Sequence, residues 1–227
     1  MDTVNPPGGD NLYELLDQWL ATPPGQMLLD WEQAQLDRVV ADMFGYHAVQ
    51  LGWPRLQALR ANRMPHRWLL AGAQGQASAV SLIADVQALP FAERSLDLVV
   101  LPHTLEFAAD PHHTLAEVER VLMPEGKLVI LGFNPGSAWG LAQRWARLRR
   151  MAQPGRELYL PQAGEFIAWR RLRDWLRLLS FEVEAGRFGI YRPALRSEHW
   201  LARWQWIDRV GDHWWPIFGA VYMLVAV

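Results

Sequence analysis

Apolar side chains recur every three or four residues over 11–21 and 26–44, and this spacing predicts two helices near the N-terminus. Gly45 follows the second pattern and is expected to end that helix. Beyond it, short continuous apolar runs alternate with helical spacing. The runs that predict strands are 46–52, 66–72, 79–84, 95–101, 127–133, 181–188 and 220–227. Further helices are expected over 56–63, 111–122, 138–150, 164–179 and 197–210.

Strands that alternate with helices are typical of an α/β domain with a mostly parallel sheet. The run 95–101 (SLDLVVL) is almost entirely apolar, as expected for a parallel strand that is covered on both faces. Asp110 is placed to cap the helix that follows, with Pro111 at its first position. We therefore expect a helical extension over 1–44 and one domain over 45–227, with a helical insertion at about 134–162.

Composition excludes several kinds of chemistry. The chain of 227 residues has no cysteine, which excludes disulfides, cysteine nucleophiles and cysteine-ligated zinc. Met1–Asp10 has neither a basic start nor an apolar run, so no signal peptide is expected. The longest apolar run, 217–227, is well short of the ~20 residues that a membrane-spanning helix needs. A cytoplasmic location is expected.

His112 and His113 are adjacent and point in different directions, so no metal site is predicted.

Charge divides the chain into two unlike halves. Residues 1–133 carry a net charge of −8, whereas residues 134–227 carry +6. The basic side chains of the protein are nearly all arginine, with Lys127 the only lysine. Most of the 13 tryptophans also lie in the second half. Stretches such as 144–150 (RWARLRR) and 169–179 suggest contact with a nucleic acid or a membrane surface. A packed amphipathic helix with a solvated arginine face explains them as well and is the better default.

One stretch, 83–135, carries a specific composite of motifs. It contains Asp85, then Leu-Pro-Phe, Asp-Leu-Val, Arg-Val-Leu and Pro-x-Gly, in that order; these are residues 89–91, 97–99, 120–122 and 124–126. The composite resembles the central half of class I S-adenosylmethionine-dependent methyltransferases, especially the group related to quinone biosynthesis. The resemblance implies a Rossmann-like, seven-stranded, mostly parallel sheet with helices on both faces, and S-adenosylmethionine as cofactor.

The resemblance also implies where the cofactor would bind. Asp85 would meet the exocyclic amine of the adenine, and Val86 would meet the ring through its backbone. The segment that follows the fourth strand would line the methionine end of the cofactor, with Leu101, Pro102 and His103. For Asp85, the alternative is that it only caps a turn.

The loop after the first strand departs from the family pattern. The family has an acidic residue followed by Gly-x-Gly-x-Gly, and this chain has Gln50, Gly52, Pro54 and Leu56 at those positions, with Trp53 beside the surviving glycine. Proline lacks a backbone donor, and leucine adds bulk where the backbone should approach the cofactor. Gln50 could still hydrogen-bond the amino-acid part of the cofactor, and Gln74 or Gln76 could bond its ribose. Two interpretations stay open: a variant that binds the cofactor differently, or a fold that has lost cofactor binding.

His103 is the candidate catalytic residue. An unperturbed imidazole suits proton transfer near neutral pH, so His103 could act as a general base; the alternative is that it packs beside the sheet. The resemblance implies methyl transfer to a small acceptor that is covered by 134–162 and 192–216. Because these segments are rich in arginine and tryptophan, the acceptor is expected to be anionic with an apolar or aromatic body. The rival hypothesis is a binding or scaffold protein without turnover. The sequence does not settle the oligomeric state.

Overall fold

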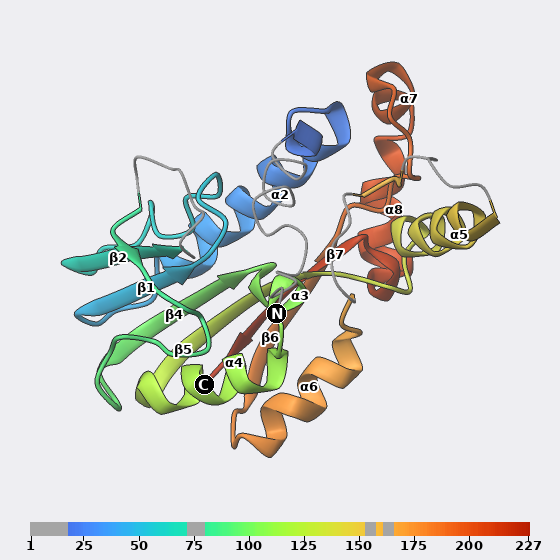
Figure 1. The fold of residues 1–227 in the computed structure, drawn as a ribbon. Helices are drawn as coiled ribbons and strands as arrows, with labels where there is room; N and C mark the ends of the chain where they lie inside the picture. The colour runs from blue at the N-terminus through green and yellow to red at the C-terminus, as the bar shows by residue number, and fades with distance from the viewer. Residues whose placement is uncertain (1–17, 72–79, 153–157, 161–165) are drawn as a thin grey trace.

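A computed structural model describes residues 18–71, 80–152, 158–160 and 166–227. Its centre is one seven-stranded sheet in the order β3-β2-β1-β4-β5-β7-β6 (Figure 1). The strands are β1 (His47–Leu51), β2 (His66–Ala71), β3 (Leu82–Ile83), β4 (Leu96–Pro102), β5 (Leu122–Phe133), β6 (Val183–Gly189) and β7 (Val221–Ala226). β1 to β5 pair in parallel, and β7 runs antiparallel to both β5 and β6. The predicted mostly parallel sheet is confirmed.

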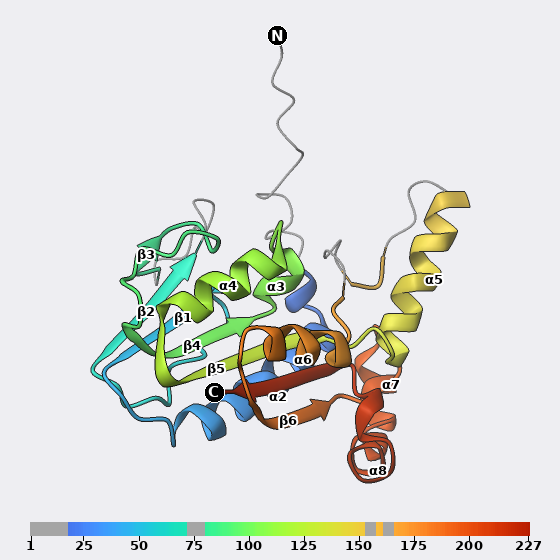
Figure 2. The same cartoon turned by 90° about the horizontal axis from the view of Figure 1, so that it is seen from below.

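The described residues also form helices, some of which cover the two faces of this sheet. They are α2 (Pro23–Val40), α3 (Thr104–Phe107), α4 (Pro111–Val121), α5 (Ala138–Ala152), α6 (Trp169–Leu178), α7 (Glu198–Arg203), α8 (Trp206–Trp214) and the 3₁₀ turn η1 (Pro216–Phe218). α4 and α6 lie on one face and α2 lies on the other (Figure 2). As predicted, Asp110 caps α4, and its carboxylate accepts hydrogen bonds from the backbone N–H groups of His112 and His113.

The alternation of side chains along the strands divides the apolar core into two layers. In β4, Leu98 and Val100 face the layer under α2, whereas Val99 and Leu101 face the layer under α4 and α6. β5 and β7 alternate in the same way. This period of two is what a parallel strand with both faces buried requires.

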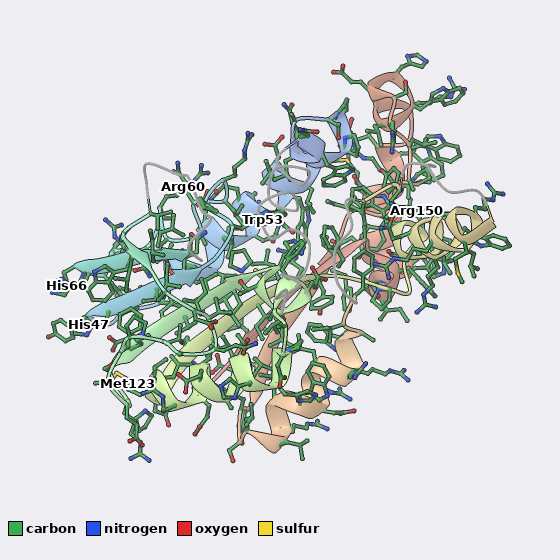
Figure 3. All side chains as sticks on the ribbon, in the orientation of Figure 1. His47, Trp53, Arg60, His66, Met123 and Arg150 are labelled. Atoms are coloured by element: carbon green, nitrogen blue, oxygen red, sulfur yellow. The ribbon has the colours of Figure 1, made fainter. Side chains whose placement is uncertain are left out.

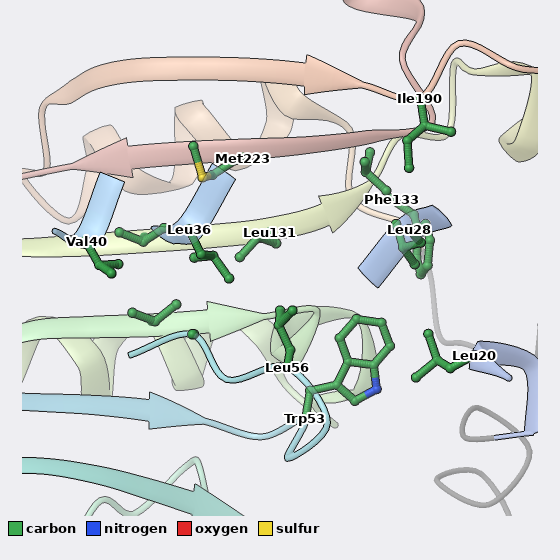
Figure 4. Packing of buried hydrophobic residues seen from close by; sticks show 14 of the residues in the cluster. Leu20, Leu28, Leu36, Val40, Trp53, Leu56, Leu131, Phe133, Ile190 and Met223 are labelled. Atoms are coloured by element: carbon green, nitrogen blue, oxygen red, sulfur yellow. The ribbon is translucent and has the colours of Figure 1, made fainter. Parts of the chain in front are cut away.

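α2 is part of the main core rather than an appendage. Leu28, Leu36 and Val40 are fully buried against the sheet (Figure 4). Pro23 opens the helix, which suits a residue without a backbone donor at the first helical position. The segment that the sequence marked as an N-terminal extension therefore supplies the cover for one face of the sheet.

The helix predicted over 56–63 is wrong, because β1 is joined to β2 by turns. Three backbone hydrogen bonds in this loop span only three residues, and one runs from the N–H of Leu56 to the carbonyl of Trp53. Side chains replace the helical bonds: the Gln50 amide bonds backbone groups of the loop, and Asn62 Nδ2 donates to the carbonyls of Val40 and Met43. Such competition by side-chain amides favours turns over helix.

Other elements differ mainly in length. β3 has two residues, although a longer strand was expected, and the helix expected over 197–210 is divided into α7 and α8. The predicted helices over 11–21 and 164–179 lie partly outside the described residues. Within the described part of the chain, none of the helices combines the length and the apolar character that crossing a bilayer requires.

Candidate active site

A small pocket lies at the carboxyl ends of β1 and β4. The order of the strands reverses between these two, and ligands of open α/β sheets bind at such a point. The pocket has a volume of about 50 Å³. Its lining residues come from the loops that follow β1, β3 and β4: Gly52, Trp53, Val86, Pro102, Thr104, Phe107 and Ala108.

Gly52 makes the sharp turn out of β1. Its φ of 77° lies in the left-handed region that favours glycine, and its N–H donates to the carbonyl of Leu70 over 2.7 Å. Thr104 Oγ1 donates to the carbonyl of Leu51 over 2.5 Å and lies beside the position that a Cβ at Gly52 would take. These contacts tie the loops after β1 and β4 together at the pocket.

Gln50 turns inward and organises the loop that follows it. Its Nε2 lies within 3.0 Å of the carbonyl oxygens of Gly52, Trp53 and Leu56, and its Oε1 accepts from the N–H of Ala58 over 2.9 Å. The side chain is buried. Its donors and its acceptor are therefore engaged by the backbone of its own loop.

Trp53 fills the space next to the pocket. Its indole is buried and packs edge-on against the ring of His103, with the ring centroids 4.5 Å apart. The backbone φ of 45° is left-handed, which is costly for a bulky residue. The indole Nε1 is buried and has no hydrogen-bond partner among the described residues. Leaving such a donor unpaired costs about 1–3 kcal/mol.

His103 lies between two buried carboxylates. Its Nε2 is 2.6 Å from Glu32 Oε1 on α2, and its Nδ1 is 2.7 Å from Glu106 Oε2 on α3. Glu106 Oε1 accepts from the N–H of Phe133 over 2.6 Å. All three charged side chains are buried, and the imidazole has no exposed surface. The cluster joins α2 to the ends of β4 and β5.

The two carboxylates set the charge of this imidazole. Burial alone lowers the pKa of His103, but the charges of Glu32 and Glu106 outweigh it and raise that pKa to about 10. Burial raises the pKa of Glu106, against the opposing effect of His103. At neutral pH the ring is an imidazolium that donates to both neighbours. In this conformation it has no free nitrogen to accept a proton, so a base role for His103 stays a prediction without geometric support.

Asp85 and Val86 follow β3, on the adenine side that the sequence predicts. Asp85 is exposed, and its Oδ1 accepts from the N–H of Gln87 over 2.9 Å, so it caps a turn. Because it is exposed, the carboxylate can also reach a ligand. Val86 lines the pocket. Leu101, by contrast, is fully buried in the layer under α4, and Pro102 lines the pocket.

The structure thus brings together Gly52, Trp53, Val86 and Pro102, and it places Gln50, Leu101 and His103 in the interior. The sequence interpretation missed Glu32. A signal was present, since Glu32 stands four residues after Leu28 and four before Leu36, on the buried stripe of α2. A carboxylate there needs a buried partner. That partner, His103, lies 71 positions away in the sequence.

S-adenosylmethionine does not fit this pocket as it stands. Pockets for ligands of drug size enclose roughly 300–1,000 Å³, several times the volume found here. Where the sequence predicts the adenine, Asp85 is exposed and Val86 lines the pocket. Where it predicts the methionine end, the buried indole of Trp53 fills the space, and its Nε1 has no hydrogen-bond partner among the described residues. The ribose contacts considered for Gln74 and Gln76 lie outside the described residues.

Comparison with known proteins identifies relatives of this chain. Residues 63–130 match a family model described as a methyltransferase domain. YafS of Escherichia coli (strain K12) is 35% identical over 178 residues, which are 77% of this chain and 69% of that protein. Demethylmenaquinone methyltransferase of Chlamydia pneumoniae is 40% identical over 60 residues, 26% of each protein. The matched region covers 61% of further mycobacterial relatives.

Solved structures share the fold. An S-adenosylmethionine-dependent methyltransferase of Thermotoga maritima gives a TM-score of 0.61 at 14% identity and covers 96% of both chains. The methyltransferase solved in complex with the Trm112 activator of Haloferax volcanii gives 0.59 at 20% identity, over 96% of this chain and 97% of that one. At these identities the likeness concerns the arrangement of strands and helices.

Proposed function

Because the chain belongs to the class I S-adenosylmethionine-dependent methyltransferase family, we propose that it binds this cofactor over the carboxyl ends of β1, β3 and β4 and methylates a small acceptor. The observation that carries the proposal is the pocket between Gly52, Val86 and Pro102, at the point where the strand order reverses. Asp85 and Val86 hold the adenine in this proposal, and the loop 52–53 and Pro102 border the methionine end.

Binding requires that the indole of Trp53 leaves its present position. Two features reduce the cost of that movement: the strained φ of Trp53 and its unpaired indole N–H. His103 is held by Glu32 and Glu106 and packs against Trp53, which lines the pocket. In the proposal it positions the segment after β4. Its role in the proposal is therefore positioning rather than proton transfer.

The acceptor is proposed to be anionic with an apolar or aromatic body. Support comes from an open groove beside α5, which combines aromatic and cationic side chains; among its lining residues are Trp145, Arg149, Tyr159 and Arg196. Arginine suits carboxylate or phosphate groups, and tryptophan and tyrosine offer apolar faces.

A second candidate function is a methyltransferase fold that binds a partner and has lost turnover. The specific observation in its favour is that Gln50 and Trp53 fill the loop and the pocket with the protein's own groups. The two candidates differ in one property, which is whether the purified chain binds the cofactor or its demethylated product.

Calorimetric titration with S-adenosylhomocysteine separates them. The enzyme proposal predicts saturable binding, and Asp85→Ala is expected to weaken it by about 1–3 kcal/mol, because the adenine amine loses an acceptor. Gln87→Ala, a neighbour whose backbone alone takes part in the turn, serves as the matched control. No heat of binding at any concentration would favour the second candidate, and unchanged affinity in Asp85→Ala would remove Asp85 from the site.

A further inference from the structure

Exposed apolar side chains gather at one end of the molecule. Among the described residues, fifteen large hydrophobic side chains are exposed, and ten of them lie within 141–151 and 200–218. These segments form α5, α7, α8 and η1, which lie together at the end away from β2 and β3 (Figures 1 and 2). A concentration of this kind on a folded surface marks a site of interaction.

α5 has two opposite apolar sides. One side is buried against the domain through Trp139 and Gln143. The other is a stripe of apolar residues spaced three or four apart, each at least half exposed: Leu141, Trp145, Leu148 and Met151. Residues at this spacing share one face of a helix. The described residues of the domain leave this outer stripe exposed.

A second apolar surface lies near the start of α5. All residues from 212 to 218 are exposed, and the large ones are Trp214, Trp215, Ile217 and Phe218. Asn134, shortly before α5, donates through Nδ2 to the carbonyls of Ile217 and Gly219 over 2.7 and 2.9 Å. These bonds hold the tip of η1 against the start of α5.

Arginines accompany the stripe of α5, and one lies on α7. Arg144 lies within the stripe of α5, and Arg149 and Arg150 flank its end; Arg149 also stands over the ring of Trp145, 6.0 Å from the centroid. Arg203 stands in the same way over Trp200 at 6.0 Å. α5 carries Arg144, Arg147, Arg149 and Arg150 and no acidic residue, so its outer stripe is basic as well as apolar.

We infer that the stripe of α5 (Leu141, Trp145, Leu148, Met151) and the tip 214–218 form a face that docks on an anionic lipid surface. Tryptophan and arginine beside aliphatic side chains are the combination that lies at the boundary between headgroups and acyl chains. A nucleic acid would use the arginines but would leave leucine, isoleucine and phenylalanine without a partner. The inference concerns a surface and does not depend on cofactor binding.

The face lies at the end of the sheet where β5 ends and β7 begins. α5 follows β5 and the tip precedes β7, so the face is built from the segments that leave and enter the sheet beside Phe133. Arg150 projects from the end of the molecule opposite to His47 and His66 (Figure 3). A membrane at this face would leave the amino ends of β1 and β2 in water.

Co-sedimentation of the whole chain with vesicles tests the inference. Vesicles of phosphatidylcholine alone are compared with vesicles of equal parts phosphatidylcholine and phosphatidylglycerol. The protein is expected to pellet with the anionic vesicles, and salt should weaken this binding without abolishing it, because apolar contacts are not screened. Arg144→Glu with Arg150→Glu, and separately Trp214→Ser with Ile217→Ser, should each lower the partition coefficient by about tenfold or more.

Matched controls use equally exposed apolar residues elsewhere. Phe44→Ser with Leu178→Ser removes two exposed side chains outside the face and should leave partitioning unchanged. Thermal unfolding of every variant checks that the fold is intact, which is expected since all changed residues are exposed. The inference is overturned if the wild type fails to pellet with anionic vesicles, if the control pair reduces binding equally, or if the chain instead binds a labelled RNA or DNA duplex in the same salt range.

Discussion

Trp53 and His103 adopt left-handed backbone conformations side by side at the ends of β1 and β4. They are two of six such non-glycine residues in the described part of the chain. Each conformation costs on the order of 1–3 kcal/mol and persists only where the surroundings enforce it. Trp53 carries a second cost, because its buried indole N–H has no hydrogen-bond partner among the described residues. These two strained residues are in contact beside the pocket, which agrees with the proposal that the loop after β1 changes conformation when a ligand binds.

Trp53→Phe tests this view of the pocket. The smaller ring removes the unpaired donor and leaves more space, so affinity for S-adenosylhomocysteine is expected to rise by about tenfold, roughly 1.4 kcal/mol. The free energy of unfolding should change little, since the lost packing is offset by the removed N–H. Isothermal calorimetry and urea unfolding measure the two quantities. Trp204→Phe, outside the pocket, is the control, and weaker binding in Trp53→Phe would instead make the indole a ligand contact.

The cluster of Glu32, His103 and Glu106 predicts a dependence of stability on pH. The pKa of His103 is raised from 6.5 to about 10 in the folded chain, so its contribution is complete below pH 6.5 and is lost as pH rises towards 10. Glu32→Gln keeps the hydrogen bond and removes one charge, so it should make this decline shallower. Urea unfolding of both proteins between pH 6.5 and 10 measures the slopes. Equal slopes would show that Glu32 does not set the charge of His103.

At the scale of elements, Gln50 makes four hydrogen bonds to the loop that links β1 and β2. Gln50→Glu would restore the acid that the family has at this position. The added oxygen would face the carbonyls of Gly52, Trp53 and Leu56, which now receive the amide N–H groups. We expect a loss of about 2–4 kcal/mol in the free energy of unfolding and no gain in cofactor affinity. Gln57→Glu, in the exposed part of the same loop, is the control; a stable Gln50→Glu with tighter binding would make position 50 a cofactor contact.

The sequence predicts the strands well because each buried strand carries a short apolar run that local spacing reveals. Periodicity is less informative where distant side chains replace local bonds. The loop 52–65 has apolar spacing that suggests a helix, but the amide oxygens of Gln50 and Asn62 accept hydrogen bonds from the N–H groups of Ala58 and Met64, and Asn62 Nδ2 ties the loop to the end of α2. The partnership of Glu32 with His103 depends on how α2 crosses the sheet. The sequence shows that the loop after β1 keeps only the first of the family's glycines. It does not show that Trp53 closes the pocket, because the position of the indole depends on the left-handed backbone at that residue.

At the scale of the whole molecule, the pocket and the face formed by the stripe of α5 and the tip 214–218 lie at different places along one sheet. The pocket lies where the strand order reverses, and the face lies beyond β5 and β7. Cofactor binding and vesicle binding can therefore be tested separately. Variants of the face should keep the affinity for S-adenosylhomocysteine, and Asp85→Ala should keep vesicle binding.

The crystal structure of this chain grown with S-adenosylhomocysteine tests the central claim most directly. The account predicts the ligand over the ends of β1, β3 and β4, with the adenine beside Asp85 and Val86 and the indole of Trp53 moved out of the space next to Pro102. The cluster of His103 with Glu32 and Glu106 should remain in place. An indole unmoved with no ligand in the pocket, or a ligand bound elsewhere on the chain, would contradict the account.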